Sequence, residues 1–163
     1  MELHTLHVFG QDYSADLAWK LLEWCRHHGA VEFTVDGLLV DGGSRAAFEQ
    51  FDRLTEAHRL PPAPRYDVQA GAVHQRERWH LNDVTVAALR IAFPLGFFSY
   101  EADDAWHEDL AVYRNSGELM LGVVTHESEG VLRLTAAEKE AFAAEGFPTR
   151  PTGEWVGVNE AAL

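Results

Sequence analysis

The sequence predicts an α+β fold in which an antiparallel or mixed sheet packs against three or four helices. Two observations support this class: apolar residues recur at helical spacing near the N-terminus, and short turns join successive strands near the C-terminus. A third observation, the loss of strand–helix alternation after the first helix, argues against a doubly wound parallel sheet. At 163 residues the chain fits a single globular domain spanning 1–163.

The N-terminal part is predicted to hold a strand over 3–9 and a helix capped by Ser14. The side chains expected on one face of that helix follow the spacing i, i+4, i+7, i+8 and i+11; they are Leu17, Leu21, Trp24, Cys25 and His28. Between the apolar runs 31–35 and 38–40, the pair Asp36-Gly37 predicts a hairpin with a type I′ turn.

The middle of the chain is predicted to contain a second helix over 44–58 and a strand over 72–81. The Pro-rich run 60–64 is interpreted as a rigid internal connection, because the composition does not change across it. A short helix capped by Asn82 or Asp83 and a short strand over 97–100 complete this part.

The C-terminal part is predicted to be a three-stranded meander followed by a capped helix. Its strands are expected over 110–114, 118–125 and 131–134, with glycine-containing turns between them. Thr135 and Glu138 have the spacing of a capping box, and Gly146 is expected to end the helix. The tail 150–163, which carries Trp155, is expected to dock on the body.

The chain is strongly acidic, with 26 acids against 13 bases and a formal net charge of −13. This charge argues against binding to nucleic acid or to an anionic membrane, both of which attract clustered Lys and Arg. It favours solubility, and it can steer a basic protein toward the surface. A single cysteine, Cys25, excludes an intrachain disulfide, and the N-terminus lacks a signal-peptide pattern, so a cytoplasmic location is expected.

The sequence lacks the motifs of several common enzyme classes. It contains no phosphate-binding loop, dinucleotide fingerprint, nucleophile elbow, His-Glu-x-x-His motif or EF-hand loop. No cofactor is predicted, although a divalent metal is compatible with the acidic segment described below.

A row of potentially basic side chains forms the first candidate site, a ligand-binding face. Strand alternation places His74, Arg76, Arg78 and His80 on one side of the strand 72–81. Guanidinium groups bind carboxylate or phosphate in a bidentate manner, so this face suits a small anionic ligand. The alternative is that the arginines pair with acids on a neighbouring strand.

An acidic segment over 101–109, with five acids and one histidine, forms the second candidate site. Asp104, His107 and Glu108 are the candidate ligands for a divalent metal such as Zn²⁺ or Mn²⁺. The alternative is a solvated acidic loop, because the spacing matches no standard metal site.

His126 and Glu127 form the third candidate site, a catalytic pair at the end of the strand 118–125. That strand is apolar on both faces, which predicts a central position in the sheet. A histidine and a carboxylate at a strand end suit acid–base chemistry or metal binding. The alternative is a polar pair that merely ends the strand.

The leading hypothesis from the sequence is a small acidic cytoplasmic protein-interaction module, for example an inhibitor or neutraliser of a basic partner. The second hypothesis is a metal-dependent or acid–base enzyme built around His126. The third is a binder of a small anionic ligand that uses Arg76 and Arg78.

Overall fold

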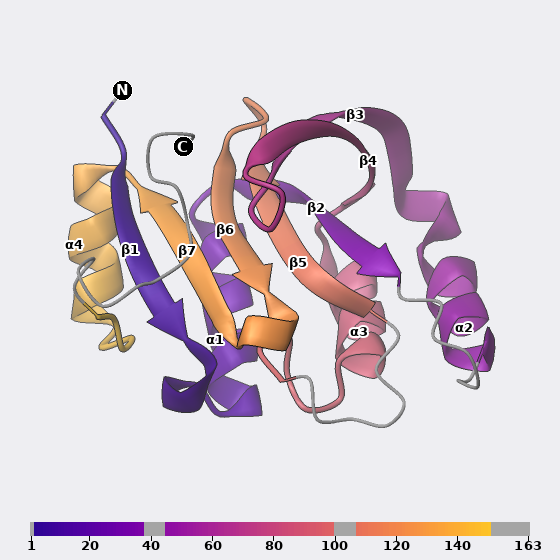
Figure 1. Cartoon of the computed structure of the whole chain (residues 1–163), viewed down its shortest axis with the longest axis horizontal. Coiled ribbons are helices and arrows are strands. Elements are labelled where there is room, and N and C mark those ends of the chain that lie inside the picture. Colours follow the sequence, from indigo (N-terminus) through magenta and orange to yellow (C-terminus); the bar gives the residue numbers. More distant parts are fainter. Residues whose placement is uncertain (1, 38–44, 100–106, 151–163) are drawn as a thin grey trace.

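The fold is α+β, as the sequence predicts. The computed structural model describes residues 2–37, 45–99 and 107–150, with the side chains of 37, 45–48, 107 and 108 left out. Seven strands form one antiparallel sheet in the order β1-β7-β6-β5-β2-β4-β3 (Figure 1). The strands are β1 (His4–Phe9), β2 (Ala30–Gly37), β3 (Arg59–Asp67), β4 (Ala72–His80), β5 (His107–Arg114), β6 (Leu119–Val124) and β7 (Glu129–Leu134).

Four helices and three short 3₁₀ turns connect the strands of the described chain. The helices are α1 (Ala15–His27), α2 (Arg45–Thr55), α3 (Asp83–Ala92) and α4 (Ala136–Ala144), and the 3₁₀ turns are η1 (Gly10–Asp12), η2 (Glu56–His58) and η3 (Thr125–Glu127). Ser14 caps α1 as predicted, accepting a hydrogen bond from the Leu17 amide at 3.2 Å. The predicted meander is β5-β6-β7, and the Thr135–Glu138 capping box opens α4.

The main core lies between the sheet and the helices α1 and α3, which lie behind the sheet in Figure 1. Leu21 and Leu22 of α1 and Leu89 of α3 are fully buried there. They pack in one cluster with sheet residues such as Phe33 and Met120. Burial of each such side chain stabilises the fold by about 1.5–3 kcal/mol, so this layer supplies most of the stability.

A second, smaller core lies on the opposite face of the sheet. Figure 1 shows the loop between β3 and β4 folded over β5 and β6. Val68 from this loop packs there with a group of sheet residues, namely Ala111, Tyr113, Leu119, Val124 and Val131. A Cβ added at Gly122 would overlap the Val68 side chain, so the glycine is what lets the hairpin come this close.

Three local predictions are wrong. Asp36 and Gly37 form no turn, because they continue β2 and pair with Glu108 and His107 of β5. The Pro-rich run is not a connection but part of β3, an edge strand in which a missing N–H does no harm. Residues 97–99 form a turn rather than a strand, and position 100 lies outside the described residues.

Arg150 is the last described residue. Its amide donates a hydrogen bond of 3.2 Å to the carbonyl of His7 in β1. The predicted docking of the tail therefore concerns residues 151–163, which lie outside the described part. None of the described helices has the length and apolar character needed to cross a membrane.

Candidate functional site

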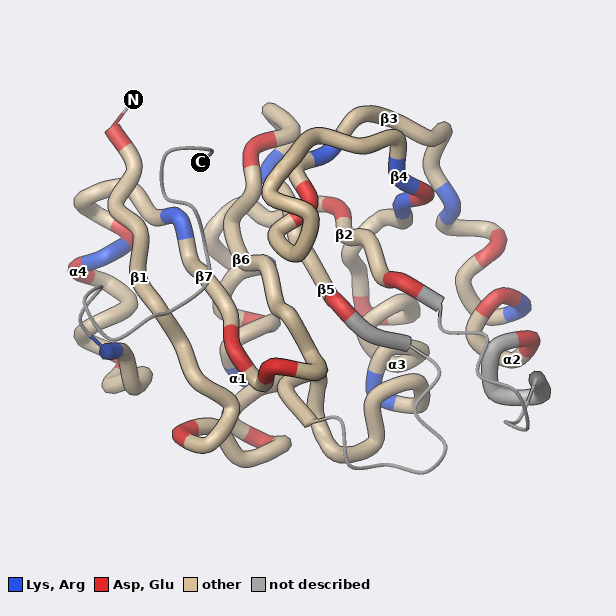
Figure 2. Tube along the Cα trace, in the orientation of Figure 1, with Lys and Arg blue, Asp and Glu red and all other residues tan. Residues whose placement is uncertain are grey.

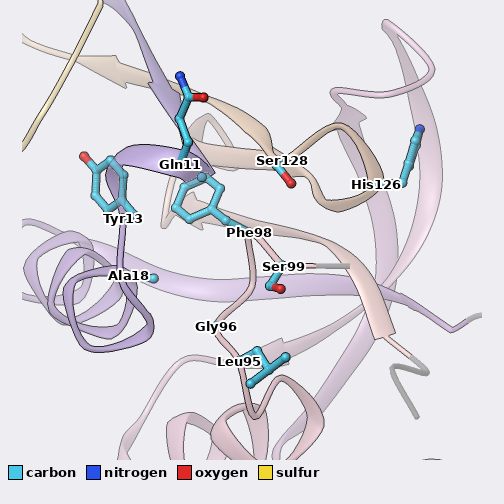
Figure 3. A pocket seen from close by; sticks show the side chains of 10 residues that line it. Gln11, Tyr13, Ala18, Leu95, Gly96, Phe98, Ser99, His126 and Ser128 are labelled. Carbon is cyan, nitrogen blue, oxygen red and sulfur yellow. The ribbon is translucent and has the colours of Figure 1, made fainter. Parts of the chain in front are cut away.

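A polar pocket of about 640 Å³ lies at one end of the sheet, where β1 and β6 end and β7 begins. We call it the strand-end pocket. It is lined by Gly10, Gln11, Tyr13, Ala18, Leu95, Gly96, Phe98, Ser99, His126 and Ser128 (Figure 3). Its volume lies within the range of ordinary small-ligand sites.

Three segments that are far apart in the sequence meet at this pocket because Gly10 has no side chain. The Gly10 amide donates a hydrogen bond of 2.6 Å to the Ser128 carbonyl. A Cβ at Gly10 would lie 2.9 Å from Cβ of Phe98 and 3.1 Å from Cβ of Ser128. A glycine at this position therefore lets η1, the turn after α3 and the end of η3 converge.

Two aromatic rings form the apolar side of the strand-end pocket. The ring centroids of Tyr13 and Phe98 lie 5.2 Å apart, and both side chains are buried. The Tyr13 hydroxyl donates a 2.9 Å hydrogen bond to the Pro148 carbonyl, and burial raises its pKa above the ordinary value. Tyr13 therefore stays neutral and contributes a surface rather than an acid or a base.

The polar side of the pocket carries two hydroxyls and one imidazole. Ser99 and Ser128 are half-buried, whereas His126 is exposed at the rim. Figure 3 shows the His126 ring pointing away from the two serines. The three groups therefore do not form a nucleophile–base pair in this arrangement.

A buried hydrogen-bond network holds the polar side in place. Asp109 and Thr125 exchange two hydrogen bonds of 2.9 Å, between each backbone amide and the other side chain. The Thr125 hydroxyl also donates to the Phe97 carbonyl at 3.1 Å. Asp109 has a left-handed φ of 54° at an irregularity of the β2–β5 pairing, where β-bulges commonly redirect a strand.

Two acidic residues next to the pocket in the chain form no ion pair with the described part of the protein. Glu127 lies between the lining residues His126 and Ser128, and Glu129 follows. Figure 2 shows acidic positions gathered at this end of the molecule. Burial, and then the charge of Glu127, raise the pKa of Glu129. None of the described lining residues is Lys or Arg, and Asp12 is already held by Arg150 at 2.9 and 3.1 Å.

Replacing Glu129 with glutamine is expected to stabilise the protein slightly at pH 7, by less than about 1 kcal/mol because solvent screens the charge. A raised native pKa means that stability is lost as the pH rises through that pKa. Glu129→Gln carries no charge at this position and does not lose this stability, so the difference in stability between the two proteins should disappear below pH 4. Thermal unfolding of both proteins between pH 3 and 8 measures the difference. A variant less stable than the native protein at pH 7 would contradict the prediction.

The predicted ligand-binding face is occupied by internal ion pairs. Arg76 donates to Asp36 at 2.6 Å and to Asp67 at 2.5 Å, and Arg78 pairs with Glu32. Asp36 and Glu32 belong to β2 and Asp67 to β3, the two strands that flank β4. The structure thus has the cross-strand pairing that was the alternative for these arginines.

The candidate histidines lie in different places. His74 lines a groove of about 460 Å³ beside the β3–β4 loop, and His80 lines a separate shallow groove with His27. His126 lies at the strand-end pocket, so these three do not converge. Among the side chains that the structure describes, no three of the His, Cys, Asp and Glu type are placed to share a metal ion. Of the predicted metal ligands, Asp104 and the side chains of His107 and Glu108 lie outside that set.

His126 is the one pocket-lining residue that the sequence analysis selected. The other polar lining residues could not be selected from the sequence, because none belongs to a motif; they are Gln11, Tyr13, Ser99 and Ser128. The available signal was weak: Gly10 directly after a strand, followed by polar residues. Comparison with known proteins finds no family, no curated protein and no solved structure that matches this chain.

Proposed function

We propose that this protein is a protein-interaction module that holds a basic segment of another protein at the strand-end pocket. One observation carries the proposal: Glu127 and Glu129 are the chain neighbours of Ser128, which lines a concave site, and no ion pair joins them to a described residue. A cationic partner would neutralise both charges. Such complementary charge accelerates association and excludes acidic competitors.

Ion pairs within the chain cancel positive and negative charges in equal number, so they leave the net charge of −13 unchanged. Seven arginines bind acids within the chain: Arg26, Arg59, Arg65, Arg76, Arg78, Arg114 and Arg150. The positive charge of each of these arginines is therefore neutralised by an acid of the same chain. With a net charge of −13, the remaining acids produce a field that attracts a basic protein over roughly a Debye length, about 8–10 Å.

The placement of Glu127 and Glu129 works against stability. Glu129 is half-buried and lies near the like charge of the exposed Glu127, which disfavours the native state, as the raised pKa of Glu129 indicates. Sites that bind a partner commonly retain such unfavourable groups, because their compensation comes from the complex. This supports a binding role for these two acids.

The other two hypotheses have less support. The anionic-ligand hypothesis needs Arg76 and Arg78, and both guanidinium groups are engaged in ion pairs. The enzyme hypothesis with a serine nucleophile needs His126 to face Ser99 or Ser128, and Figure 3 shows its ring directed away from both serines. The cytoplasmic location stays a prediction, and the burial of the free Cys25 accords with a reducing compartment.

The proposal predicts that removing two charges at the pocket weakens partner binding by about 2- to 30-fold, from roughly 0.2–1 kcal/mol for each exposed charge. The variant is Glu127→Gln with Glu129→Gln. The matched control is Glu140→Gln with Glu145→Gln, which removes the same charge from exposed positions in and just after α4. Immobilised protein is incubated with lysate at low and high salt, and bound proteins are identified and quantified.

A basic protein recovered in stoichiometric amount at low salt, and lost in the pocket variant only, is the expected result. Equal loss in both variants would show an effect of net charge alone and would contradict the site. Failure to recover any basic protein at low salt would contradict the function.

A further inference from the structure

We infer that the strand-end pocket receives the guanidinium group of an arginine from the basic partner. This inference rests on the proposed function and specifies the chemistry of the group that enters the site. It follows from the charge around the pocket, from the groups that line it and from the character of its rim.

The charge around the pocket selects a cation. None of its described lining residues is Lys or Arg, while Glu127 and Glu129 adjoin the lining residue Ser128 in the chain. Arg150, close to this region, is bound to Asp12 by two hydrogen bonds. An anion would meet uncompensated carboxylates, whereas a cation would lower the energy of both.

The lining groups favour a planar cation over a compact ammonium. The Tyr13 and Phe98 rings are only 7% and 4% exposed, so they offer their pocket-facing parts to the flat side of a guanidinium, and the hydroxyls of Ser99 and Ser128 can accept its N–H groups. A guanidinium is also more weakly hydrated than an ammonium, so it loses less on entering a half-enclosed site. The chain uses the same contact internally, with Arg90 lying 5.3 Å above the Trp19 ring and Arg59 5.3 Å above the Trp79 ring.

The exposed apolar residues at the rim of the pocket favour an arginine within a protein over a free small molecule. Leu95, which lines the pocket, is 52% exposed, and Ile91 one turn earlier in α3 is 48% exposed. An apolar residue next to the arginine of a partner would cover this surface. A free guanidine compound such as agmatine has no group to do so.

The first test measures binding of three short capped peptides by calorimetry and by amide chemical shifts. Each peptide has a central arginine, lysine or citrulline between two leucines, and agmatine is the fourth probe. We expect the arginine peptide to shift amides around Gly10, Ser99 and Ser128, to bind severalfold more tightly than the lysine peptide and at least tenfold more tightly than the citrulline peptide.

Equal binding of the citrulline peptide, or tighter binding of the lysine peptide, would overturn the guanidinium assignment. Agmatine binding as tightly as the arginine peptide would overturn the assignment to a partner side chain.

The second test places a positive charge at the rim. Leu95→Lys should weaken binding of the arginine peptide about tenfold by repulsion. Val84→Lys is the matched control, since Val84 in α3 is 50% exposed, much as Leu95 is, and does not line the pocket, and it should change binding less than twofold. Both positions are exposed, so both variants should fold. Equal effects of the two variants would overturn the inference.

The two proposals fail in different ways. If Leu95→Lys leaves capture of the basic partner unchanged while Glu127→Gln with Glu129→Gln abolishes it, the proposed function stands and the arginine pocket is wrong. If no basic partner is captured at all, both are wrong.

Discussion

Replacing Glu32 with glutamine is expected to lower the free energy of unfolding by about 3 kcal/mol, the largest single effect that we predict. The Glu32 carboxylate is 6% exposed and pairs with both Arg65 and Arg78, each held from a strand of the β3–β4 hairpin. Its loss leaves two guanidinium groups close together without their acid. The side chains of Arg65 and Arg78 keep 13% and 17% exposure, so the cost should lie near the lower end for buried pairs.

Urea unfolding of Glu32→Gln measures this effect, and Glu77→Gln is its control. Glu77 also pairs with an arginine, Arg59 at 2.9 Å, but its side chain is 62% exposed. Removal of that charge should cost no more than about 1 kcal/mol, as for other surface pairs. If the two variants were equally stable, the ion pairs beneath the hairpin would contribute no more than surface pairs, and the prediction would be wrong.

Replacing Gly122 with alanine is expected to cost about 1–3 kcal/mol, the second largest effect. The added Cβ would overlap Val68 at the tip of the hairpin, and neighbouring contacts to Leu119 are also close. The hairpin would have to move away from the sheet, which would open the smaller core. The shift should be visible as faster amide exchange in the loop between β3 and β4.

A second substitution tests the cause. Val68→Ala removes the methyl groups that the new Cβ would meet, so it should cost less in Gly122→Ala than in the native protein. A double-mutant cycle should therefore give a favourable coupling of about 1 kcal/mol or more. Simple additivity of the two costs would show that Gly122 is required for another reason.

The helices and the C-terminal meander could be predicted because their signals are local. The cap at Ser14, the capping box at Thr135 and the turn over 115–117 each depend on residues within a few positions of one another. Hydrogen bonds of this short range form in almost any tertiary setting, so the sequence pattern is sufficient.

The failed predictions concern pairing between distant segments. The Asp36-Gly37 pair has the composition of a turn, but β5 offers it partners at positions 107 and 108, and the strand continues. The Pro-rich run has the composition of a connection, but it forms an edge strand because β4 provides a template on one side only. The first pairing joins segments that are far apart in the chain, and the second joins the two strands of the β3–β4 hairpin; both depend on neighbouring strands that a short sequence window does not contain.

The candidate site was predictable only in part for the same reason. His126 could be selected because it ends an apolar strand, and that strand is central and fully buried. The remaining lining residues come from positions 10–18 and 95–99, which reach His126 only through the close approach at Gly10. Nothing in either segment alone predicts that meeting.

The sequence by itself determined the fold class, the positions of the helices and the excess of acid that a basic partner would sense. These follow from composition and from local spacing. Only the tertiary structure decided which of the acidic residues form ion pairs and which do not. Packing brings Glu32, Asp36 and Asp67 to arginines beneath the hairpin, while Glu127 and Glu129, on either side of the pocket residue Ser128, form no ion pair within residues 2–37, 45–99 and 107–150. The net charge is a sum over residues, but its neutralisation depends on which side chains the fold brings within a few ångströms of one another.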